Sequence, residues 1–254
     1  MNLRASYRYQ LADHKKSILI FYLVFVCAYL AMAICLAVFS AKYGIASTGS
    51  ISGLEFTTTI FLFVSGLNAF KENFGMLTQN GISRRSILVG RILVIATVSL
   101  FVALMDKIWY FAGLGLSKLF RDAIDCTIFV DMLYERSAVL SPFAFQMEAL
   151  VFNFAMYMAV FSVGYFITVL FYRMNKAGKI IVGASVPVFF LIILPIIDEQ
   201  FFACAISTKF FTFAAKAFGL ESGIPWCAVG SFFVLSAVFL AAAWLIMRRA
   251  PLHE

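Results

Sequence analysis

The chain has 254 residues, of which 63% are hydrophobic and 13% are charged, and its mean hydropathy is +0.95. A soluble domain carries about 25% charged residues, so this composition excludes a soluble enzyme, a disordered chain and a coiled coil. The net charge of +7 does not indicate nucleic-acid binding, because no segment could form a soluble basic domain and membrane proteins sort Lys and Arg across the bilayer. We therefore predict a polytopic membrane protein.

Runs of about 20 apolar residues predict an all-α fold with six transmembrane helices. They cover about 18–41, 53–70, 86–110, 149–172, 180–197 and 225–247. The first run exceeds the apolar core of a signal peptide and lacks a convincing cleavage site after it, so we expect a retained helix. Arg91 lies near one end of the third run, where its side chain can extend to the interface. Pro187 is expected to kink the fifth helix.

The distribution of basic residues predicts the orientation of these helices. With both termini inside the cell, thirteen of the twenty Lys and Arg residues lie on the inner side, six lie on the outer side, and Lys107 lies at a helix end. Positive charge accumulates on the cytoplasmic side of membrane proteins. The sequence therefore predicts a membrane protein with both termini on the cytoplasmic side.

Three segments outside the predicted spans are long enough to fold. Residues 1–16 place Leu3, Tyr7 and Leu11 at four-residue steps with basic residues displaced around the helix, which predicts a helix lying in the inner interface. The outer loop 113–147 is acidic. The outer loop 198–223 contains six Phe residues, so we expect it to dip into the outer leaflet as short helices. Cys126 and Cys204 lie in these two loops, and both a disulfide and free thiols are compatible with the sequence.

Few charged residues fall within the predicted spans. Asp106 lies about 30 Å along the third span from its start near Ser83, so Asp106 and Lys107 are expected at the outer interface. Glu55 is expected in the first turns of the second span, on the same side. This placement disfavours an ion-coupled carrier, which needs charge near mid-membrane. Milder polar residues, such as Ser65, Asn153 and Gly164, are expected to serve helix packing.

Catalytic and metal-binding chemistry is not indicated. The two histidines, His14 and His253, lie close to the ends of the sequence, which disfavours a buried metal site based on His. The cysteines have no zinc-type spacing, and the sequence contains no GxxxxGK[ST] phosphate loop. We expect no catalytic residue, no metal ligand and no enzymatic activity in this chain.

The loop between the second and third spans is the most informative segment. Phe70, Phe74 and Leu77 recur at helical spacing and predict a short amphipathic helix. Gly81 can supply the left-handed residue that ends this helix, and Ser83 can cap the next one. Arg84 and Arg85 follow directly, although cations in a first turn oppose the helix dipole by about 0.3–1 kcal/mol each. Either membrane topology or contact with a cytoplasmic partner would explain them.

A short helix after the second span, closed by Gly-Ile-Ser-Arg-Arg and running straight into the third span, resembles the permease subunit of type-2 ATP-binding-cassette (ABC) exporters. The six spans, the inner termini, the interfacial first segment and the Phe-rich outer loop agree with this resemblance. The topological likeness covers the whole chain, whereas the sequence motif covers about residues 70–91.

The resemblance implies a mechanism and a set of site residues. Two permeases, as a homodimer, would work with two copies of a separate ATPase that binds ATP and Mg²⁺. Residues 71–85 would form a coupling helix that contacts the ATPase, with Phe74 and Leu77 as anchors. The coupling residues would be Lys71, Glu72, Phe74, Leu77, Gly81, Ser83, Arg84 and Arg85, and the substrate pathway would be lined by Thr58, Phe61, Ser65, Asn68, Ser185 and Phe189.

The Phe-rich composition and the absence of mid-membrane charge favour a hydrophobic or amphipathic cargo. The resemblance implies that this cargo is a bacteriocin-like peptide or a drug-like compound, moved out of the cell across a bacterial cytoplasmic membrane. Membrane lipid is the other expected partner. Two alternatives stay open on the sequence: a non-transporting scaffold or regulatory subunit, and an ion-coupled secondary carrier.

Overall fold

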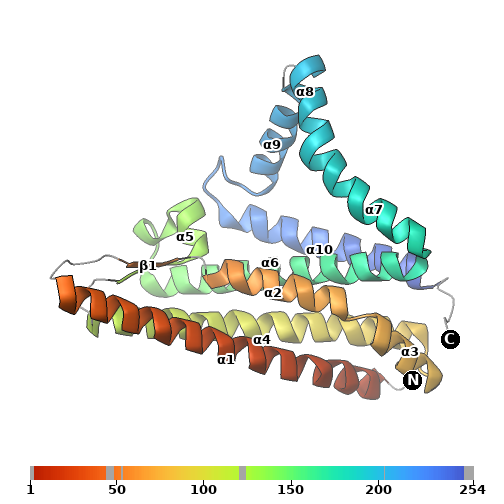
Figure 1. Ribbon diagram of the computed structural model, residues 1–254, viewed down its shortest axis with the longest axis horizontal. Helices are drawn as coiled ribbons and strands as arrows, with labels where there is room; N and C mark the ends of the chain where they lie inside the picture. Colours follow the sequence, from red (N-terminus) through yellow and green to blue (C-terminus); the bar gives the residue numbers. More distant parts are fainter. Residues whose placement is uncertain (1–2, 44–48, 53, 120–123, 203, 249–254) are drawn as a thin grey trace.

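The computed structural model describes residues 3–43, 49–52, 54–119, 124–202 and 204–248 (Figure 1). Almost all of them are helical, as the sequence predicts. The helices are α1 (Leu3–Tyr43), α2 (Leu54–Asn68), α3 (Lys71–Gln79), α4 (Arg84–Leu119), α5 (Phe129–Tyr134), α6 (Pro142–Arg173), α7 (Lys176–Val188), α8 (Leu194–Phe202), α9 (Ala205–Ala217) and α10 (Pro225–Met247), with a 3-10 turn η1 (Arg136–Ala138) and a π-helical segment η2 (Phe189–Ile193).

Among the described residues, four helices are long and apolar enough to cross a membrane. They comprise Leu3–Ala31 within α1, Arg84–Gly115 within α4, Pro142–Arg173 (α6) and Pro225–Met247 (α10). The second predicted span corresponds to α2, which has 15 residues. The fifth is divided into α7, η2 and α8, none of which reaches spanning length alone. The membrane character of the protein thus rests on four helices.

A separate interfacial helix at the start of the chain is not observed, which corrects one expectation. The helix α1 runs without interruption from Leu3 to Tyr43, a stretch that contains neither Gly nor Pro. Ser6, Gln10 and His14 are buried at four-residue steps, and Tyr7 and Leu11 pack beside them against the protein core. The Tyr7 hydroxyl lies 3.1 Å from Thr97 Oγ1 of α4. The regular spacing in this segment therefore marks a helix–helix contact.

The helix α6 lies in the middle of the bundle, where it contacts α2, α4 and α10. Two glycines allow α2 and α6 to approach closely: a Cβ added at Gly66 would lie 2.6 Å from the Phe161 carbonyl oxygen, and one added at Gly164 would lie 2.5 Å from the Phe63 carbonyl oxygen. Ser162 and Ser236 share a 2.9 Å hydrogen bond between α6 and α10. Gly164 thus serves helix packing, as expected, and Gly66 and Ser162 do the same.

A short parallel strand pair, β1 (Gly49–Ser52) and β2 (Ile124–Thr127), was not expected. The strands follow α1 and α4, and both of these helices begin at the α3 end of the bundle (Figure 1). Chain segments that leave two parallel helices run in the same direction, which accounts for the parallel pairing. The long helices also shorten the acidic loop, because α4 extends to Leu119 and α6 begins at Pro142.

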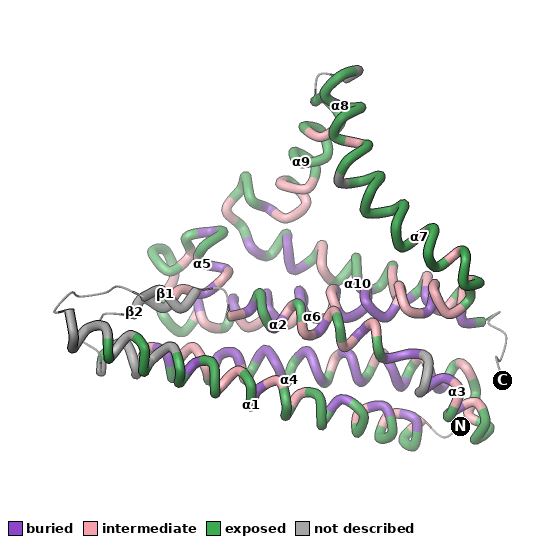
Figure 2. Tube along the Cα trace, viewed as in Figure 1, coloured by how far each residue is buried: buried purple, intermediate pink, exposed green. Residues whose placement is uncertain are grey.

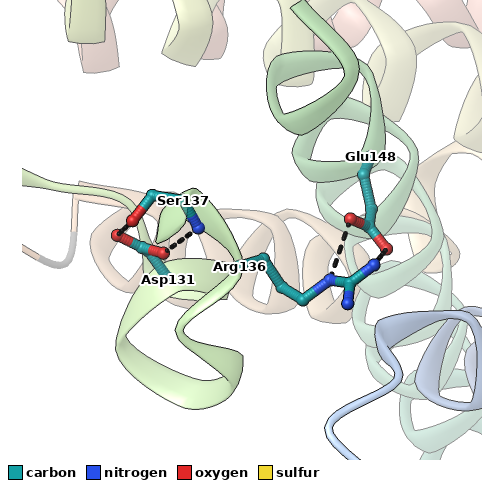
Figure 3. Close-up of polar contacts among 4 residues, drawn as sticks. All are labelled: Asp131, Arg136, Ser137 and Glu148. Carbon is teal, nitrogen blue, oxygen red and sulfur yellow. Dashed lines mark hydrogen bonds and ion pairs between the residues drawn. The ribbon is translucent and has the colours of Figure 1, made fainter. Parts of the chain in front are cut away.

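This loop lies at the end of the bundle opposite α3 (Figure 1), and Figure 3 shows polar contacts within it and between it and α6. The Asp131 carboxylate accepts hydrogen bonds from Ser137 N–H, at 2.8 Å, and from Ser137 Oγ, at 2.7 Å. Arg136 pairs with the buried Glu148 of α6 at 3.3 Å. Tyr134 donates a 2.6 Å hydrogen bond to the Phe218 carbonyl oxygen, and burial raises the pKa of this phenol to about 12.

Residues 176–217 form a second region, here called the arm, which comprises α7, η2, α8 and α9. It projects at an angle from α10 and is largely exposed, whereas purple buried residues concentrate in the bundle (Figure 2). Pro187 lies inside α7 and Pro195 inside α8, on either side of the π-helical segment, where each removes a backbone donor. The loop 198–223 is mainly helical, as predicted. Cys204 is a free thiol, and the Cys126 side chain lies outside the described residues.

Candidate functional site

The short helix α3 begins just after α2, and its ends have the predicted structure. Gly81 has φ of +73°, and its N–H donates to the Thr78 carbonyl oxygen while Ile82 N–H donates to that of Leu77. These two bonds close the helix in the way that a left-handed glycine allows. Ser83 Oγ then accepts a 3.3 Å hydrogen bond from Ser86 N–H and caps α4.

Phe74 and Leu77 are not exposed, which corrects their expected role as anchors for a partner. Phe74 is 0% exposed and Leu77 is 4% exposed. The Phe74 ring stacks on Phe70, with centroids 4.8 Å apart, and meets Tyr172 of α6 edge-on. On the same helix, Asn73 donates a 3.0 Å hydrogen bond to Asp13 of α1. These side chains attach α3 to the bundle, because an amphipathic helix buries its apolar side wherever an apolar surface is available.

The opposite face of α3 and its exit loop remain exposed. Met76 is 50% exposed, and Gln79, Asn80, Gly81, Ser83 and Arg85 are exposed with it. Arg84 points elsewhere: its Nη1 donates to the carbonyl oxygens of Met247 and Arg248 at the end of α10. Of the expected coupling residues, Gly81, Ser83 and Arg85 therefore belong to this outward surface, and the side chains of Lys71 and Glu72 lie outside the described part.

Beside the residues that join α2 to α3, Arg91 of α4 is fully buried. Its side chain does not extend to the interface as expected. Its guanidinium donates to the Ala69 carbonyl oxygen and to His14 Nε2, at 2.8 Å for the latter, and lies 5.5 Å from the Tyr165 ring centroid. Because a guanidinium can only donate, His14 Nε2 must accept, which makes this imidazole neutral with its proton on Nδ1. One arginine thereby joins α1, the end of α2, α4 and α6.

A cavity of 540 Å³ adjoins this arginine cluster between α1, α2 and α6. Its walls mix apolar and polar side chains, and three of the six predicted pathway residues line it: Phe61, Ser65 and Asn68. The other lining residues are Asp13, His14, Ser17, Val64, Leu67 and Thr168. The α1 contribution was missed because the first segment was interpreted as an interfacial helix rather than as part of the bundle.

The remaining predicted pathway residues lie elsewhere. Thr58 is buried toward the far end of α2, where its hydroxyl donates to Asp106 at 3.2 Å. Ser185 and Phe189 are exposed on the arm, which diverges from the bundle (Figure 1). The structure thus brings Phe61, Ser65 and Asn68 of α2 together with α1 and α6. It separates them from Thr58 and from the arm residues Ser185 and Phe189.

A second polar cluster surrounds Asp106, about 22 Å along α4 from Arg91. Its carboxylate accepts hydrogen bonds from Tyr22 of α1 at 3.5 Å, from Thr58 of α2, and from Tyr157 of α6. Asp106 is 7% exposed and connects α4 with α1, α2 and α6. Its spacing along α4 could be read from the sequence, but the convergence of three hydroxyls on it could not.

The chemistry available in these two clusters is binding and hydrogen bonding. Within the described residues, no group of three or more His, Cys, Asp or Glu side chains is arranged to hold a metal ion. No family model matches this sequence, and no curated protein or solved structure is significantly similar to it.

Proposed function

We propose that this chain is the membrane-spanning permease subunit of an ATP-driven exporter, powered by a separate ABC-type ATPase. The observation that carries the proposal is the way α3 is attached: buried Phe74 and Leu77 hold it at the end of the bundle. On the outward side, Met76 of α3 and Arg85 at the start of α4 are exposed. A helix that is attached to the bundle by buried side chains and exposed on its outward face can transmit a displacement by a partner to the helices it packs against. The ATPase would contact this outward face, and ATP and Mg²⁺ would bind to the ATPase.

In this proposal α2 and residues 180–197 of the α7–η2–α8 run also cross the membrane, giving six spans. At 1.5 Å per residue α2 is about 22 Å long, and the helical run from Lys176 to Phe202 is about 40 Å long. The start of α1 and the C-terminal end of α10 lie with α3 at one end of the molecule (Figure 1). That end would face the cytoplasm of a bacterial cell, as the distribution of Lys and Arg favours. A second copy of the chain would complete the transporter.

The cavity beside Arg91 is the proposed place where cargo first meets the permease. It adjoins the α3 attachment, since Asp13 both lines the cavity and accepts the hydrogen bond from Asn73 of α3. A displacement of α3 would therefore move Asp13 in the cavity wall. The mixture of Phe61 and Val64 with Ser65 and Asn68 suits an amphipathic peptide or a drug-like compound with one polar and one apolar side.

The test is copurification of the ATPase with the tagged chain from its native membrane in mild detergent. Met76→Asp should abolish capture of a subunit with ATPase activity, because a charge would be buried at the centre of the contact. Met132→Asp is the matched control, since Met132 is also an exposed methionine (58%) but lies on α5 at the far end. Amphipathic peptides should stimulate ATP hydrolysis by the intact complex.

Capture of no ATPase by the well-folded wild-type chain would contradict the proposal. Equal loss of capture with Met76→Asp and Met132→Asp would contradict the assignment of the contact to α3. Stimulation of ATP hydrolysis by a polar solute and not by amphipathic peptides would contradict the proposed cargo class.

The buried Asp106 favours a second candidate, an ion-coupled carrier. A carboxylate that is buried in the bundle and accepts hydrogen bonds from hydroxyls of three helices can bind a proton or a cation, and ionisable residues buried in transmembrane bundles often mark ion and proton pathways. For such a carrier, transport in vesicles without ATP should follow an imposed ion gradient and be lost in Asp106→Asn. For the exporter, transport should require ATP and be insensitive to the gradient.

A further inference from the structure

The bundle has a second cavity that the proposed function does not use. It is a groove of 490 Å³ between α1 and α4. Its walls are apolar and include Leu11, Ile18 and Leu19 of α1 and Val98, Phe101 and Met105 of α4. The groove is not closed over by protein, because Leu19 is 66% exposed and Phe101 is 48% exposed.

The groove has the length of a lipid tail in one leaflet. Its α1 wall extends from Leu11 to Tyr22, about 16 Å at 1.5 Å per residue. This is roughly half of the ~30 Å hydrocarbon core of a bilayer. Both of its walls belong to helices that are long and apolar enough to cross a membrane. An acyl chain is therefore the apolar group that this groove would meet.

One end of the groove is positively charged. Lys15 lines it, and Arg4 and Arg8 lie on the same face of α1, since positions 4, 8 and 15 fall close together at 100° per residue. All three are exposed. Among the described residues, none of them forms an ion pair with an acidic side chain. The charges are therefore available to an anion outside the protein.

We propose that this groove binds an anionic phospholipid of the leaflet at the α3 end. One acyl chain lies between α1 and α4, and the phosphate contacts Lys15, with Arg8 and Arg4 further toward the end of α1. Charge complementarity favours this occupant over a zwitterionic lipid, whose phosphate charge is offset by its own cationic group, and over an apolar protein segment, which offers the three basic side chains no counter-charge. The inference is independent of the exporter assignment.

The test uses the purified full-length chain in detergent and native mass spectrometry, with phosphatidylglycerol and phosphatidylcholine that carry identical acyl chains. Phosphatidylglycerol should bind more tightly. Lys15→Ala should weaken its binding about fivefold, since a basic residue near an anionic lipid contributes about 1 kcal/mol. Lys16→Ala is the matched control: Lys16 is also exposed and adjacent in sequence but does not line the groove, and its loss should leave the affinity unchanged.

A second measurement locates the acyl chain. Phe101→Trp fluorescence should be quenched by brominated phosphatidylglycerol added in small molar excess to the detergent-solubilised protein. Leu100→Trp, exposed on α4 but outside the groove lining, should be quenched much less. Equal affinity for the two lipids, equal effects of the two lysine changes, or equal quenching of the two tryptophans would each overturn the proposal.

Discussion

The bundle of α1, α2, α4, α6 and α10 and the arm of α7–α9 are built from similarly apolar sequences but pack very differently. In the bundle, glycines allow close approach and buried polar groups find partners on other helices, as with Arg91 and Asp106. In the arm, large apolar side chains such as Ile180 (71% exposed) have no protein surface against them. Apolar character brings a helix to the membrane, whereas small and polar residues in register determine which helices pack together.

The largest expected effect is at the closest helix contact. Gly164→Ala places a methyl group against the Phe63 carbonyl oxygen, which belongs to backbone and cannot rotate away. We expect a loss of about 3 kcal/mol of unfolding free energy, at the upper end for overpacking. The measurement is thermal unfolding in detergent, followed by circular dichroism.

Gly183→Ala in the arm is the matched control, because a Cβ there would meet nothing within 4 Å. It should be neutral or stabilise α7 by up to about 1 kcal/mol, the helix propensity gained over glycine. Similar destabilisation by both changes would break the distinction between bundle and arm.

The next effect concerns the Asp106 junction. Asp106→Ala removes the acceptor shared by three hydroxyls: Tyr157 loses its partner, whereas Tyr22 and Thr58 keep the carbonyl oxygens of Val102 and Leu54. We expect a loss of about 2 kcal/mol of stability, since an orphaned buried hydroxyl keeps its desolvation cost. Asp106→Asn retains an acceptor oxygen and should be milder in the same unfolding assay. An unaffected Asp106→Ala protein would show that the junction does not hold the bundle.

A smaller loss of stability is expected from the contact between Arg84 at the start of α4 and the end of α10. Arg84→Ala removes the guanidinium that binds the last carbonyl groups of α10, and should cost about 1 kcal/mol. Arg85→Ala changes the neighbouring exposed arginine and should leave stability unchanged while weakening partner capture. The same unfolding assay separates the two, and equal effects would contradict the division of roles.

The smallest effect is local to the arm. The Asp198 carboxylate accepts hydrogen bonds from Ile206 N–H at 2.9 Å and Ser207 N–H at 2.7 Å, which cap α9. Asp198→Ala should speed amide exchange at these two residues about fivefold, as loss of a helix cap implies. Exchange in α6 should not change, and a change there would show that arm and bundle unfold together.

This cap should also depend on pH. Burial alone would raise the pKa of Asp198, but the hydrogen bonds from Ser207 and Ile206 outweigh it and lower the pKa below its ordinary value. The stability that the cap contributes is therefore fully present above the ordinary carboxyl pKa and is lost as the pH falls through the lowered value. The protection factor at Ser207, which corrects the exchange rate for its intrinsic pH dependence, should fall only over that acidic range.

The sequence by itself determined the membrane character of this protein, the type of its elements and the local structure around α3. Hydropathy, the left-handed Gly81 and the Ser83 cap act over a few neighbouring residues, so they can be recognised along the chain. The continuous α1 and the strand pair were not predicted, because they depend on how distant segments pack. In the fifth apolar run, which is divided into α7, η2 and α8, only a kink at Pro187 was expected.

Only the tertiary structure decided which side of each helix is available for function. Phe74 and Leu77 turned inward because α6 offers them an apolar surface, and Arg91 stayed buried because His14 and the Ala69 carbonyl oxygen lie within reach. Helical periodicity identifies a face but not what covers it, since the covering residues are distant in sequence. The α3 surface, the cavity beside Arg91 and the groove at Lys15 all arise from contacts of α1 or α6 with other helices.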